Sequence, residues 1–143
     1  MLALPQPFED LGHTADLAVR VHGASAEQAM ERLALALAAL LAGGGEVTAD
    51  AEESLSVRGG PGLSGTAVAL LREILFRFCT ERRIPFAIEV VRADETGAEA
   101  RVRTGPYDPA RHAAGHDVKA VTWHRARLER EGNRWVGEVV VDV

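Results

Sequence analysis

The chain has 143 residues, of which 47% are hydrophobic and 26% are charged, a composition typical of a single soluble globular domain over residues 1–143. Its only cysteine, Cys79, excludes an intramolecular disulfide and favours a reducing compartment. The formal charge of −5 argues against tight, direct nucleic-acid binding, which depends on lysine and arginine at the phosphates.

The first half of the chain begins with a predicted strand over 16–22, in which apolar residues alternate with other residues. Ser25 and Gln28 then fit a capping box, so we predict a helix from there to about residue 42, ended by the glycines 43–45. The second half of this helix is apolar on all sides and is expected to be buried. Residues 46–58 are interpreted as one bent strand or two short ones.

A second helix is predicted to end near residue 82. Its apolar residues have the spacing of one buried helix face, and they are Val68, Leu71, Ile74, Leu75, Phe78 and Cys79. Cys79 is therefore expected to pack in the core. The preceding glycines 60, 62 and 65 match G-x-G-x-x-G, but Pro61 removes an amide and no parallel βαβ unit is predicted, so we interpret them as a turn.

Strands dominate the rest of the chain, and they are predicted over 86–91, 98–103, 118–129 and 134–143. The segment 105–117 is interpreted as a loop. Strands in runs, rather than in strict alternation with helices, predict an α+β fold with a mainly antiparallel sheet and two helices. Residues 46–104 form the series strand, helix, strand, strand, and so does the remainder of the chain without them.

No window of the chain predicts a membrane-spanning helix. The longest apolar run, 33–42, is far shorter than the roughly 20 residues that cross a bilayer. The N-terminus lacks the pattern of a signal peptide. We therefore expect a cytoplasmic protein without membrane contact.

Two aspartates are the first candidates for chemistry. Asp16 opens the first predicted strand, and Asp142 interrupts the apolar end of the last one. If these strands are neighbours, about 4.8 Å apart, their carboxylates can share one ion. Two carboxylates, a main-chain carbonyl and water suit Ca²⁺, Mg²⁺ or Mn²⁺. The alternative is an aspartate in a turn and an unrelated exposed aspartate near the end of the chain.

The histidines are weaker candidates. His13 is either a hydrogen-bonding residue beside a turn or a residue that orients Asp16. His112 and His116 have the i, i+4 spacing of a metal site, but the glutamate of a metalloprotease is missing, and Pro109 and Gly115 favour a loop. A zinc hydrolase is therefore disfavoured. A group of arginines near Glu73 and Glu81 is interpreted as a solvated helix face, and its members are Arg72, Arg77, Arg82 and Arg83.

Four segments together resemble the archease family in their order and spacing over nearly the whole chain. They are FEDLGHTADL at 8–17, GPYDPARH at 105–112, VKAVTWH at 118–124 and VVVDV at 139–143. The resemblance implies two nested strand-helix-strand-strand units, with the inner one over about 46–104. It also implies a non-enzymatic accessory protein of an RtcB-type RNA ligase in tRNA splicing and RNA repair, which speeds guanylylation of the ligase and helps its multiple turnover.

The resemblance further implies a divalent cation, Ca²⁺ first with Mg²⁺ or Mn²⁺ as alternatives, bound by Asp16, Asp142 and Val143. Val143 would contribute a main-chain oxygen or the terminal carboxylate. His13, His112 and Lys119 are expected to support this site. The family usually carries a tryptophan and an asparagine before a glutamate in the second helix, and only the glutamate, Glu73, matches here.

Two other functions stay open. A metal-dependent phosphohydrolase would act through Asp16, Asp142 and His13, although a clear nucleophile or general base is missing from the pattern. A metal-binding chaperone for RNA-processing proteins would protect several unrelated clients from aggregation.

Overall fold

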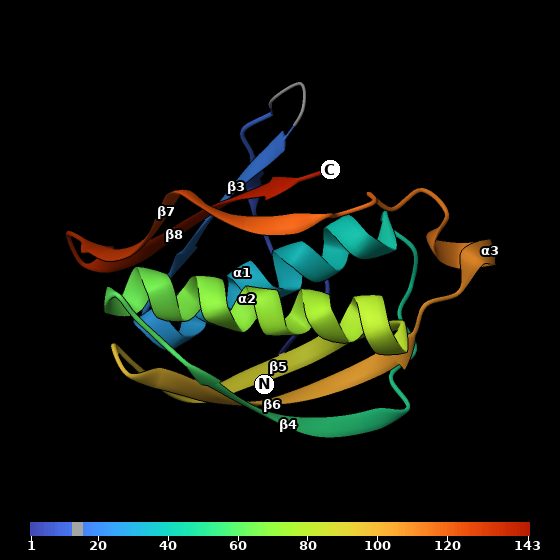
Figure 1. Cartoon of the computed structure of the whole chain (residues 1–143), viewed down its shortest axis with the longest axis horizontal. Helices are drawn as coiled ribbons and strands as arrows, with labels where there is room; N and C mark the ends of the chain where they lie inside the picture. Colours follow the sequence, from blue (N-terminus) through green and yellow to red (C-terminus); the bar gives the residue numbers. More distant parts are fainter. Residues whose placement is uncertain (13–15) are drawn as a thin grey trace.

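The computed structural model describes residues 1–12 and 16–143, in which two four-stranded antiparallel sheets enclose two long helices (Figure 1). The lower sheet of Figure 1 has the order β1 (Leu2–Ala3), β5 (Arg83–Asp94), β6 (Gly97–Pro106) and β4 (Ala51–Arg58). The upper sheet has the order β2 (Glu9–Asp10), β3 (Asp16–Gly23), β8 (Arg134–Asp142) and β7 (Ala120–Glu131). This α+β, antiparallel architecture confirms the predicted fold class.

The first helix, α1 (Ala26–Ala42), begins and ends where the sequence predicts. The Ser25 hydroxyl accepts a hydrogen bond from the Gln28 amide at 3.1 Å, and the Gln28 side chain accepts one from the Ala24 amide at 2.8 Å. At the other end Gly43 has a φ of 61°, and its amide donates to the carbonyl of Ala39. The helix is buried because it contacts strands of both sheets.

The second helix, α2 (Gly62–Glu81), lies in front of α1 in Figure 1, between β7 above and β4 below. Leu71, Ile74 and Phe78 are buried as predicted. The prediction for Cys79 is wrong, because its side chain is exposed. Residue 79 lies at the border of the apolar stripe, one position after Phe78, and the packing of α2 against the strands leaves this border uncovered.

Both nested units have the same topology. In the inner unit β4, α2, β5 and β6 follow in sequence, and β6 lies between β4 and β5. In the outer unit β3, α1, β7 and β8 follow in sequence, and β8 lies between β3 and β7. Each unit leaves one face of its sheet and its helix apolar, and packing the two units together buries these faces in one core.

The structure differs from the predicted elements in four places. The strand expected over 46–58 begins only at Ala51. The loop 105–117 contains a one-turn helix, α3 (Pro109–His112), so the two predicted helices become three within the described residues. The two-residue strands β1 and β2 were not predicted. In β7 the register with β8 shifts between Thr122 and Arg127, and Arg125 has a φ of 58°.

Candidate functional site

Asp16 and Asp142 face each other across the ladder between β3 and β8. They are Cα partners in the register, the first residue of β3 and the last of β8. Directly opposed side chains lie on the same face of a sheet, with Cβ atoms about 4.5–5.5 Å apart. Asp16 is half-buried and Asp142 is exposed. The first and last long strands are therefore neighbours, as the shared site requires.

The two-residue period of the strands directs both carboxylates away from the helices. Leu17 and Val19 of β3, like Val139 and Val141 of β8, are buried in the core. The intervening positions consequently point to the outer face of the upper sheet. A shift of one residue in β3 would turn Leu17 and Val19 outward, so the hydrophobic pattern of β3 helps to specify the register that pairs the aspartates.

We call the end of the β3–β8 ladder that carries Asp16 and Asp142 the carboxylate corner. A third strand, β7, begins beside Asp142 at this corner. Ala120, the first residue of β7, is a Cα partner of Asp142. The amide of Lys119 donates a hydrogen bond to the carbonyl of Asp142 at 2.8 Å. Lys119, which we expected to support the site, therefore contacts it through the main chain, and its side chain is exposed.

The corner carries two negative charges that lack a neutralising side chain within the described residues. Like charges directly opposite each other in a sheet are unfavourable. The ion pairs of residues 1–12 and 16–143 all involve other carboxylates. A cation at this corner would remove the repulsion between Asp16 and Asp142.

The equivalent corner of the inner unit is neutralised differently. Asp50 directly precedes β4, and its amide donates to the carbonyl of Thr104 near the end of β6. The guanidinium of Arg83, at the start of β5, hydrogen-bonds to the Asp50 carboxylate and lowers the pKa of that group. The inner corner therefore has one aspartate with an arginine, whereas the outer corner has two aspartates.

The donor set fits a hard divalent cation. Carboxylate oxygens are ligands that Ca²⁺, Mg²⁺ and Mn²⁺ prefer, and Val143 follows Asp142 with further main-chain oxygen. Within the described residues no group of three or more histidine, cysteine, aspartate or glutamate side chains could hold a metal. Asp16 and Asp142 could supply two ligands, and a bound cation would need others.

Two histidines were expected to support the site, and the structure describes one of them. His13 lies outside the described residues. His112 is buried, its Nδ1 accepts a hydrogen bond from the Asp108 amide at 2.9 Å, and its Nε2 lies 2.7 Å from the carbonyl oxygen of Glu46. With Nδ1 as an acceptor, Nε2 carries the proton and donates it to that carbonyl. Both ring nitrogens therefore join the α3 segment to the residues after α1, and neither contacts Asp16 or Asp142.

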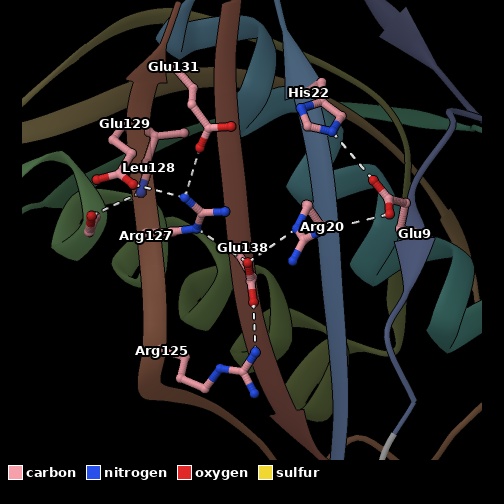
Figure 2. A network of polar contacts seen from close by, with 10 residues as sticks. Glu9, Arg20, His22, Arg125, Arg127, Leu128, Glu129, Glu131 and Glu138 are labelled. Carbon is pink, nitrogen blue, oxygen red and sulfur yellow. Dashed lines mark hydrogen bonds and ion pairs between the residues drawn. The ribbon is translucent and has the colours of Figure 1, made fainter.

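Farther along the same outer face lies a cluster of charges that the sequence analysis missed. Glu138 of β8 is only 4% exposed, and Figure 2 shows it in the middle of three arginines. Its carboxylate lies 3.3 Å from the guanidinium nitrogens of Arg20, Arg125 and Arg127. Burial opposes ionisation of Glu138, but the hydrogen bonds from Arg127 and Arg20 outweigh it, and the pKa of Glu138 is lower than usual.

This cluster joins all four strands of the upper sheet. Arg20 of β3 also pairs with Glu9 of β2, and Arg127 of β7 also pairs with Glu129 and Glu131 (Figure 2). The available sequence signal was a single carboxylate within the apolar run 135–141. The cluster holds β3 and β8 together on the face that carries Asp16 and Asp142.

Comparison with known proteins relates nearly the whole chain to one family. A model of the archease protein family matches residues 8–143. The "Protein archease" of Methanopyrus kandleri is 36% identical over 140 residues, covering 96% of this chain and 99% of that protein.

Two solved structures have a similar fold. The solution structure of Methanobacterium thermoautotrophicum protein 1598 matches with a TM-score of 0.67 at 22% identity, covering 95% of this chain and 98% of the other. The crystal structure of an "archease, possible chaperone" from Thermotoga maritima matches with a TM-score of 0.63 at 20% identity, over the whole of both chains. Among the described helices none is long and apolar enough to cross a membrane.

Proposed function

Because this chain belongs to the archease protein family, we propose that it is a non-enzymatic accessory protein that stimulates guanylylation and multiple turnover of an RtcB-type RNA ligase in tRNA splicing and RNA repair. The observation that carries the proposal is the pairing of Asp16 with Asp142 at the end of the β3–β8 ladder. A cytoplasmic location and the absence of tight RNA binding by the isolated protein belong to the same proposal.

Asp16 and Asp142, with main-chain oxygen at Val143, would hold a divalent cation, Ca²⁺ first with Mg²⁺ or Mn²⁺ as alternatives. When bound, such a cation supplies charge neutralisation and positioning for phosphoryl transfer. The chain's own part is to hold two carboxylates at a fixed spacing, because the sheet register leaves their backbones little freedom.

The incomplete donor set supports a shared site. Ca²⁺ takes six to eight oxygen ligands, and Mg²⁺ takes six. Two carboxylates and a main-chain oxygen leave coordination positions for water, a nucleotide or side chains of a partner. Asp142 is exposed and can approach such a partner without a rearrangement of the sheet.

The test is guanylylation of the cognate RtcB-type ligase at limiting Mn²⁺ and GTP, with and without this protein. We expect the wild type to stimulate the reaction, and Asp16→Asn or Asp142→Asn to abolish the stimulation with the fold retained. Asp117→Asn, at an exposed aspartate before β7, is the matched control and should stimulate normally. Normal stimulation by Asp142→Asn would exclude the carboxylate pair from the mechanism.

Two alternatives are tested alongside. The Thermotoga maritima protein is described as a "possible chaperone", and a client-binding role predicts that several unrelated proteins are protected from aggregation. A phosphohydrolase needs a nucleophile and a base within hydrogen-bond reach, and the described contacts of Asp16 and Asp142 include neither. Turnover of a phosphate ester that is lost in Asp16→Asn would favour the enzyme instead.

A further inference from the structure

A groove of about 600 Å³ lies beside α2, the helix drawn in front of α1 in Figure 1. Gly65, Ala69, Arg72 and Phe76 of α2 contribute to it at helical spacing, and Arg58 of β4 and Trp123 of β7 lie at its sides. We refer to these six residues as the α2 groove. Since β4 and β7 are edge strands of their sheets, the groove lies between the two sheet edges.

The α2 groove holds two aromatic side chains that the fold leaves in solvent. Phe76 is 60% exposed and Trp123 is 45% exposed, whereas most large apolar side chains of the described residues are buried. Aromatic residues and arginine are enriched at the centres of protein–protein interfaces, where they contribute most of the binding energy. Gly65 lets the Trp123 ring pack directly against α2, because a Cβ at this position would approach the ring to 2.8 Å.

The groove also carries positive charge on a chain whose net charge is −5. Arg58 and Arg72 form no ion pair with any described carboxylate, whereas Glu73, which also lines the groove, is paired with Arg77 at 3.2 Å. The Nε of Arg72 donates to the carbonyl of Val121 at 2.9 Å, and its guanidinium lies 5.6 Å from the centre of the Trp123 ring. The charge of Arg72 is therefore held in place without being neutralised.

The α2 groove is near the carboxylate corner. Trp123 lies three positions after Ala120, the β7 partner of Asp142. At about 3.3 Å per residue this separation is about 10 Å along the strand. A standard interface buries about 800 Å² on each partner, a patch of about 16 Å radius. The groove lies on the helix side of the upper sheet and the two carboxylates lie on its outer face, so one bound protein would contact both by reaching around the edge strand β7.

From these observations we propose that the α2 groove is the docking site for an acidic segment of the partner protein, with an apolar side chain seated between Phe76 and Trp123 and a carboxylate on Arg58 or Arg72. The inference rests on the proposed function, in which that partner is the RtcB-type ligase. Docking at the groove would bring the ligase to Asp16 and Asp142 without using those carboxylates for affinity.

The experiment measures the affinity of the purified cognate ligase for the full chain by calorimetry, and guanylylation in the same samples. Phe76→Ser and Arg72→Glu should each weaken binding by about tenfold or more. The matched controls are Val91→Ser, at a position that is also 60% exposed but lies on β5, and Arg134→Glu, at an exposed arginine in the β7–β8 hairpin. Both controls should bind like the wild type, and the groove variants should recover full stimulation at saturating concentration.

The outcomes separate this inference from the proposed function. If Phe76→Ser and Arg72→Glu bind like the wild type while Asp142→Asn loses stimulation, the groove is not the docking site but the proposed function stands. If the wild type neither binds nor stimulates the ligase, both are refuted. A single-stranded oligoribonucleotide that quenches the fluorescence of the wild type, but not of Arg72→Glu, would identify RNA as the occupant and overturn the inference.

Discussion

Replacement of Glu138 by glutamine tests how much the charge cluster on the outer face contributes to the fold. The substitution keeps the shape of the side chain and removes its charge, while three arginines remain around it. A hydrogen bond to a charged group contributes about 1.5–3 kcal/mol. The arginine side chains are 31–48% exposed, and water can replace part of what they lose. We therefore expect a loss of about 2 kcal/mol, well below the sum of three such bonds.

Thermal unfolding followed by circular dichroism measures this loss. With an unfolding entropy of about 2.1 cal/mol/K per residue, 2 kcal/mol corresponds to a fall of about 7 °C in Tm for 143 residues. Glu131→Gln is the matched control, because Glu131 also pairs with Arg127 but has a 56% exposed side chain. It should change the stability by less than about 0.5 kcal/mol.

The difference between wild type and Glu138→Gln should depend on pH. The folded protein lowers the pKa of Glu138 below its ordinary value of 4.5, so the ionised carboxylate stabilises the fold above that pH. This contribution falls as the pH drops below 4.5 and is lost as the pH passes through the folded pKa. A Tm difference that is equal at pH 7 and pH 3, or equal for Glu138→Gln and Glu131→Gln, would refute the reasoning.

Three further perturbations follow from the structure. Ca²⁺ at a hundred times its Kd should stabilise the wild type by about 2.7 kcal/mol in thermal melts. The Tm of Asp142→Asn should not change with Ca²⁺. In EDTA this variant should melt at or slightly above the wild-type Tm, because the substitution removes the repulsion between two opposed carboxylates. Ser25→Ala removes the hydroxyl that caps α1 and should cost about 1 kcal/mol without affecting ligase stimulation, and an unchanged Tm would show that the cap is dispensable. The hydrogen bonds from the Thr96 hydroxyl and amide lower the pKa of Asp94 to about 2. Thr96→Val removes the hydroxyl, so NMR titration of this variant should give a pKa of Asp94 closer to 3.8. An unchanged titration would contradict this assignment.

Local features of the fold were predictable because they depend on residues close in the chain. The cap at Ser25, the glycine stop at Gly43 and the alternation in β3 each follow from a few neighbouring side chains. The missed strands β1 and β2 have only two residues each, and their pairing with β5 and β3 carries no periodic signal. Cys79 was misplaced because helical periodicity indicates the centre of an apolar stripe better than its border.

The candidate site was predictable in part. The resemblance singled out Asp16 and Asp142, whereas the face of the sheet that their side chains occupy became clear only from the strand pairing. Glu138 was missed, because a carboxylate in an apolar run does not reveal that Arg20, Arg125 and Arg127 will surround it. Those arginines come from two other strands, and only the sheet order brings them together.

The sequence by itself determined the two long helices and most of the strands, because capping and periodicity are local properties of the chain. The tertiary structure alone decided that β3 lies beside β8, and that β4 and β7 become the edges that border the α2 groove. These arrangements follow from burying the apolar faces of two nested units against each other. Asp16 and Asp142, near opposite ends of the chain, are neighbours because this packing makes them so.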